Sequence, residues 1–244
     1  MRISTAQMQF RATNAMLDRF SDVSKTQQQL ATGRRILQPS DDPVGFTKLL
    51  PLREIVEQHN QYERNADVAT TRLTQEDATL DGVSDLLIRF NELAIQGNNT
   101  TLDAQSRATI SQEVRQLLDE LVSLANAKDT NGEYIFAGDA VTTQPITEAP
   151  AGTFNYNGDN GQRNLQIGAT RQIAIADAGD DVFVNIPFSG GGTQNIFQTI
   201  YDFATGLEAN IPPGNTVLQD IQSALDHMSG VRARVGARLN AIDG

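Results

Sequence analysis

One helical pattern dominates this sequence and runs almost without a break from residue 43 to about residue 96. A helix of roughly 50 residues would be roughly 80 Å long, so the pattern predicts a rod. Pro51 lies near its start and is expected to kink it. The apolar positions form one drifting stripe: Leu49, Leu52, Val56, Ala66, Leu73, Leu80, Leu87 and Ala94, reinforced by Val83, Ile88 and Phe90.

A second helix is predicted from about residue 103 to residue 127. Its stripe consists of Ile110, Val114, Leu117, Leu118, Leu121 and Leu124. The connection at residues 97–100 is short and polar, and helices joined so closely pack as antiparallel neighbours. The two helices are therefore predicted to form a hairpin.

The N-terminal arm, ahead of the rod, has a separate heptad pattern. Apolar and small residues recur at alternating steps of three and four over four heptads, and the pattern turns polar from Ser24 onward. Nothing in the arm itself covers this stripe, so we expect it to pack on helices of other subunits and to be mobile in the free chain. The predicted subunit-assembly seam is Ile3, Ala6, Phe10, Thr13, Leu17 and Phe20.

A loop should join the arm to the rod. Gly33 is a plausible end for the arm helix, and Asp42 followed by Pro43 has the chemistry of a helix N-cap and first helical residue. The predicted arm–rod joint is Arg34, Arg35, Asp41 and Asp42. Pairing across subunits and local capping both remain open for these four residues.

Beyond residue 132 the sequence becomes rich in Gly, Asn, Asp and Thr, with short β-like runs at residues 134–137, 153–156, 164–167 and 172–175. Residues 157–161 have the composition of a hairpin turn. Helical patterns return at Ile196, Ile200, Phe203 and Leu207, and again from Leu218 to Ile242. That last helix is still amphipathic at Gly244, so we expect the natural chain or a longer parent to continue.

These patterns predict an α+β, mainly α fold: a long antiparallel helical-bundle (coiled-coil) rod with an inserted small β-rich domain. The predicted ranges are an assembly arm and linker at 1–42, a long helical hairpin at 43–132, a β-rich outer domain at 133–192 and returning rod helices at 193–244.

Charge narrows the classes of partner. The net charge is −11, but the residues before Leu37 carry six basic and two acidic side chains, so the remainder carries −15. Such a body repels nucleic acid and anionic membranes, whereas the basic arm can dock on the acidic body of an identical neighbour. No stretch approaches the ~18 apolar residues of a membrane span, and the first residues lack the apolar core of a secretory signal peptide.

No constellation of catalytic or ligand-binding residues is recognisable. The chain has no cysteine, and His59 and His227 have no metal-binding partner at helical spacing. Asn155, Asn157 and Asp159 have the spacing of a calcium loop, but Gln166 stands where the bidentate Glu is required. Phosphate-loop and nucleophile-elbow motifs are absent. We therefore expect no enzyme activity, cofactor or metal.

Several segments resemble one family of bacterial appendage proteins. These are LATGRRILQPSDDP at 30–43, NGEYIFAG at 131–138, YNGD at 156–159, QIG at 166–168 and VRARVGARLN at 231–240. The first resembles the N-terminal signature of the flagellin superfamily, and the others resemble the junction branch of that family. The resemblance covers nearly the whole chain and implies a flagellin-like fold.

It also implies a function. Such proteins are structural adaptors of the extracellular flagellum, exported unfolded through its type III apparatus without a cleaved signal, and lie between hook and filament. The implied partners are the first hook-associated protein, flagellin, further copies of the chain and an export chaperone; nucleic acid, membrane and small-molecule substrates are not expected. The family ends in a C-terminal helix that pairs with the arm, and this sequence stops before most of it. A flagellin filament subunit and a helical sensor or receptor ectodomain are the alternatives.

Overall fold

The computed structural model describes residues 5–150 and 152–244. Its helices are α1 (Thr5–Thr32), α2 (Pro43–Gly97), α3 (Ala104–Ala125), α4 (Ile196–Glu208) and α5 (Gly214–Asp243), with a π-helical turn η1 (Asp180–Val184). Its strands are β1 (Ile146–Ala149), β2 (Thr153–Tyr156), β3 (Asn164–Gln166), β4 (Gln172–Ala174), β5 (Ile186–Pro187) and β6 (Thr193–Gln194). The predicted fold class, mainly α with small β elements, is confirmed.

The chain divides into two compact units, residues 1–60 and 61–244, and the long helix α2 belongs to both. The predicted ranges 1–42, 43–132, 133–192 and 193–244 were drawn from sequence patterns and not from compactness, and they stay predictions.

Helix ends follow the local chemistry of the sequence. Gly33, at φ +65°, takes the left-handed conformation that ends α1. The Asp42 carboxylate accepts a 2.8 Å hydrogen bond from the Gly45 amide, which makes it the cap of α2, as predicted. Asp103 caps α3 in the same way, since its side chain accepts from the Ser106 amide at 2.8 Å.

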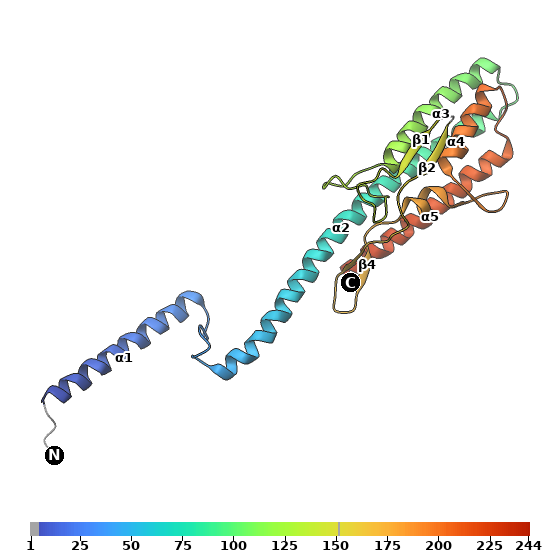
Figure 1. The fold of residues 1–244 in the computed structure, drawn as a ribbon. Helices are drawn as coiled ribbons and strands as arrows, with labels where there is room; N and C mark the ends of the chain where they lie inside the picture. The colour runs from blue at the N-terminus through green and yellow to red at the C-terminus, as the bar shows by residue number, and fades with distance from the viewer. Residues whose placement is uncertain (1–4, 151) are drawn as a thin grey trace. The chain divides into compact units, whose positions relative to one another are not determined.

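The core of the second unit is built from the α2 segment beyond residue 60 together with α3, α4 and α5, which lie side by side (Figure 1). The α2 segment from residue 61 and α3 run antiparallel: Gln75 donates to the Lys128 carbonyl, whereas Arg89 pairs with Glu113. The predicted hairpin is thus confirmed. All four helices bury apolar side chains in this core, among them Leu73, Leu80, Leu87, Phe90, Val114, Leu118, Leu121, Ile200, Phe203, Leu207, Ile221, Met228, Val231 and Val235.

Polar contacts hold the helices in register. The Ser111 hydroxyl donates to the Ala204 carbonyl at 2.9 Å and joins α3 to α4. Arg232 of α5 pairs with Asp77 at 3.2 Å and Asp81 at 2.6 Å, both on α2.

The β-rich insert consists of three separate antiparallel pairs, β1–β2, β3–β4 and β5–β6. The predicted runs at 153–156, 164–167 and 172–175 correspond to β2, β3 and β4. The predicted hairpin at 157–161 is wrong, because β2 pairs with the preceding strand β1 and not with β3. That segment is instead held by the Asp159 carboxylate, which accepts from the amides of Asp139 and Gly161.

The strand predicted at residues 134–137 is also wrong. Tyr134 forms only an isolated bridge with Lys128, and the chain then turns. Phe136 is fully buried and meets the ring of Phe183 edge to face at 5.1 Å. Burial of aromatic surface in the helical core therefore decided the conformation here, over local β propensity.

Candidate assembly surfaces

The predicted seam lies on an uncovered face of α1. Phe10, Leu17 and Phe20 are 73%, 63% and 76% exposed. Thr13 turns its hydroxyl back to the Gln9 carbonyl at 3.0 Å, as threonines in helices do. Ala6 belongs to α1 and Ile3 lies outside the described residues. Three large side chains of the seam are thus open to solvent.

A second apolar stripe on α1 was not predicted. Met16, Val23 and Leu30 are 77%, 55% and 85% exposed. Their spacing of seven places them on one side of the helix, next to Phe20 of the seam and farther round from Phe10 and Leu17. This regular spacing could have predicted the second stripe from the sequence. It was overlooked because the first stripe already explained why the helix is amphipathic. A helix with two uncovered stripes can contact more than one neighbour.

At the arm–rod joint, Asp41 organises the loop. Its carboxylate lies 2.7 Å from Lys25 Nζ and accepts hydrogen bonds of 3.0 Å from the amides of Leu37 and Gln38. The Lys25 ammonium, followed by those two amides, lowers the pKa of Asp41 to about 2. Asp41 is therefore ionised at every physiological pH and ties the loop to α1.

Asp42 and Arg35 complete the local network. Arg35 Nη2 lies 3.1 Å from Asp42 Oδ2, and the Gly45 amide and then Arg35 lower the pKa of Asp42. A Cβ on Gly45 would lie 2.5 Å from the same carboxylate, so a larger residue there would displace the Asp42 side chain from its capping position. Three of the four predicted joint residues thus contact one another or the loop within one chain, which is the local-capping alternative.

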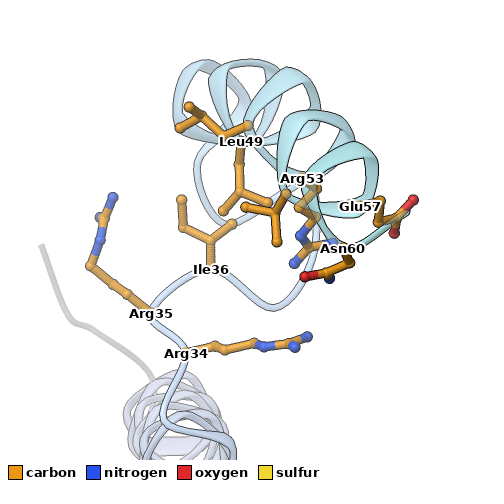
Figure 2. A pocket seen from close by; sticks show the side chains of 9 residues that line it. Arg34, Arg35, Ile36, Leu49, Arg53, Glu57 and Asn60 are labelled. Atoms are coloured by element: carbon orange, nitrogen blue, oxygen red, sulfur yellow. The ribbon is translucent and has the colours of Figure 1, made fainter. Parts of the chain in front are cut away.

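Arg34, the fourth joint residue, forms no ion pair with any residue that the structure describes. It borders a groove of about 770 Å³ in the first unit (Figure 2). Ile36 on the loop faces the start of α2, which carries Leu49 and Arg53. The lining residues are Arg34, Arg35, Ile36, Leu49, Leu52, Arg53, Val56, Glu57 and Asn60. The groove thus has an apolar floor and a mostly basic rim.

A buried polar cluster in the second unit was missed from the sequence. Glu76 of α2 is fully buried, and its Oε1 accepts from the Asp177 amide at 3.1 Å. Asp177 in turn lies 2.7 Å from Arg238 Nη2 of α5. Burial, followed by the nearby Asp177 charge, raises the pKa of Glu76 to about 8. A lone Glu within a helical pattern gave no signal that it would be enclosed.

Other polar residues have structural roles. The His227 ring lies 2.7 Å from the Asp181 carbonyl, and the Asn157 amide donates to Thr147. The described residues contain no group of three or more His, Cys, Asp or Glu side chains placed to hold a metal ion. None of the described helices is both long and apolar enough to cross a membrane.

Two curated proteins match along essentially the whole chain. The flagellar hook-associated protein 3 of Escherichia coli strain K12 is 27% identical over 261 aligned positions, covering 100% of this chain and 81% of the relative. The protein of the same name from Salmonella typhimurium is 26% identical, covering 99% and 81%.

A solved structure supports the fold. The flagellar junction protein of Legionella pneumophila superposes with a TM-score of 0.71 at 22% identity, covering 80% of this chain and 99% of that one. The model of the bacterial flagellin N-terminal helical region matches residues 3–140, more than half of the sequence. The chain therefore belongs to the family defined by the bacterial flagellin N-terminal helical region.

Proposed function

We propose that this chain is a structural adaptor of the bacterial flagellum that joins the hook to the flagellin filament. The similarity to hook-associated protein 3, which extends along essentially the whole of this chain, supports this role. The proposed neighbours are the first hook-associated protein, flagellin and further copies of the chain. Export through the flagellar type III apparatus with a dedicated chaperone, and an extracellular location, belong to the same proposal.

The observation that carries the proposal is the uncovered seam of α1. Burying a Phe or Leu side chain is worth about 1.5–3 kcal/mol relative to leaving it in water. Phe10, Leu17 and Phe20 are exposed in the free chain, so this favourable free energy is gained only when another helix covers them. In this proposal residues 1–42 form the assembly arm, 43–132 and 193–244 the rod, and 133–192 an outer domain.

Assembly of this kind needs no chemistry beyond helix packing. A helix whose two stripes meet different neighbours makes heterologous contacts, which generate rings or open helical arrays. Such an array can follow the symmetry of the structures on either side of it.

The test is a double substitution on the seam, Phe10→Ala with Leu17→Ala, in a strain whose own junction protein has been deleted. We expect hooks without filaments, and we expect the variant protein to be released to the medium as a monomer. The matched control is Arg11→Ala with Asp18→Ala, which has the same spacing on another side of α1 and should leave filaments intact.

Both variants should keep the unfolding free energy of the free chain within about 0.5 kcal/mol, because the changed residues are exposed. Normal filaments on hooks carrying the seam variant would refute the proposal. Long filaments formed by the purified chain alone would support a flagellin filament subunit instead.

A further inference from the structure

The basic groove of the first unit has the composition of a docking site. Its floor contains Leu52 and Val56, which are 61% and 57% exposed. Arg34 and Arg53 line it without an ion-pair partner among the described residues. Two unpaired guanidinium groups beside an apolar floor favour an occupant that is both acidic and apolar.

Charge indicates where such an occupant can come from. Residues 1–60 carry eight basic and six acidic side chains, a net charge of +2, whereas residues 61–244 carry eleven and twenty-four, a net charge of −13. Copies of this chain are therefore complementary to one another, first unit to second unit. A second copy is the one occupant whose chemistry is already known.

The second unit presents a matching ridge on α2. Ile88 and Ile95 are 49% and 59% exposed, and Ile88 was predicted to reinforce the apolar stripe of this helix. Asp85 and Glu92 share their side of the helix, since steps of three, four and seven residues return to one face. Arg89 lies beside them but is already paired with Glu92 at 2.8 Å and Glu113 at 2.6 Å. The ridge is thus apolar with a net negative border.

We propose that the α2 ridge of one copy (Asp85, Ile88, Glu92 and Ile95) docks into the basic groove of a second copy. An amphipathic helix laid into an apolar groove is a common mode of protein recognition. Groove and ridge are different surfaces of one chain, so the contact is heterologous and leaves a free groove and a free ridge at the ends of any chain of copies. The inference rests on the proposed function, because an adaptor layer requires such an array.

Cysteine cross-linking tests the contact directly, since the chain has no native cysteine. Val56→Cys and size-tagged Ile88→Cys proteins are mixed at high concentration and mildly oxidised. We expect mostly mixed dimers. The control is Val68→Cys, which has the same 49% exposure as Ile88 but lies on the opposite side of α2. Equal yields with Val68→Cys, or mainly Val56–Val56 dimers, would overturn the proposal.

A charge swap tests the rim. Arg53→Glu in the groove copy should lower the mixed-dimer yield roughly tenfold, the loss that about 1.4 kcal/mol of repulsion produces. Asp85→Arg in the ridge copy should restore it by re-forming an opposite pair. Failure of this rescue would also overturn the proposal.

The two proposals can fail separately. Cross-linking uses the purified chain and reports only the contact between copies, whereas the α1 seam variant is scored by filaments on hooks. Normal filaments with the seam variant, together with successful cross-linking, would refute the adaptor role alone. Hooks without filaments in the seam variant, together with failed cross-linking, would refute the groove–ridge contact alone.

Discussion

At the residue scale, the most unusual group is Glu76. It is fully enclosed, its Oε2 has no hydrogen-bond partner among the described residues, and Asp177 lies beside it. A second carboxylate nearby opposes ionisation, while Arg238 and Arg234 favour it more weakly. Its raised pKa therefore means that the folded chain holds a proton at neutral pH.

This gives a pH dependence with a definite sign. The pKa of Glu76 is about 8 in the fold and near 4.5 when unfolded, so the folded state binds the extra proton between these values. The contribution of Glu76 to the unfolding free energy is fully present below pH 4.5. It falls as the pH rises towards 8, by up to about 1.4 kcal/mol per pH unit.

The variant Glu76→Gln keeps an acceptor for the Asp177 amide and removes the titration. We expect its unfolding free energy to exceed that of the parent at pH 9 and to match it near pH 4.5, in urea titrations followed by circular dichroism. Glu92→Gln, at an exposed position, is the control and should follow the parent. If the unfolding free energy changed equally with pH in the parent and in Glu76→Gln, the raised pKa would not belong to Glu76.

At the element scale, α2 is one helix with two environments. From Ala69 onward its stripe is packed against α3 and α5, whereas Val44, Leu50, Leu52 and Val56 are exposed. The sequence stripe is continuous through both parts. Its covered part stabilises the chain and its uncovered part is available for contact with other molecules.

Two leucines of this helix give a direct comparison. Leu87→Ala should lower the unfolding free energy by about 2–5 kcal/mol, because Leu87 is fully buried and its loss leaves a cavity. Leu52→Ala, at a 61% exposed position, should change it by no more than about 0.5 kcal/mol. Denaturant unfolding measures both, and similar losses would show that the uncovered part is packed in the free chain.

At the scale of the whole molecule, the two units differ in how they are stabilised. The second unit has a shared hydrophobic core, whereas α1 relies on its own backbone hydrogen bonds and the joint at Asp41. Most helical stability in proteins comes from tertiary packing of an apolar face, and the apolar face of α1 is exposed in the free chain.

Amide hydrogen exchange should show this difference. We expect the amides of α1 to exchange at least roughly a hundredfold faster than those of α3 in the free chain, because opening α1 breaks no core. Mass spectrometry of peptic fragments from one sample compares both helices under identical conditions. Equal protection of α1 and α3 would contradict the prediction of a mobile arm.

Local chemistry allowed much of the fold to be predicted. The end of α1 and the start of α2 followed from Gly33 and Asp42, because caps act within three residues of themselves. The apolar stripe of α1 could also be recognised in the sequence, since a heptad stripe needs no tertiary information, whereas its use as an assembly seam stays a prediction. The motifs that resembled the flagellin superfamily are likewise linear.

Long-range contacts decided the rest. Residues 134–137 became a turn because Phe136 is buried against Phe183, 47 positions away in the sequence. Glu76 lost its solvent when Asp177 was brought onto it, and the groove formed because the loop places Ile36 and Arg34 beside α2. The sequence alone determined which segments are helical and which faces are apolar. Only the tertiary structure decided which faces are covered, because burial depends on residues distant in the chain.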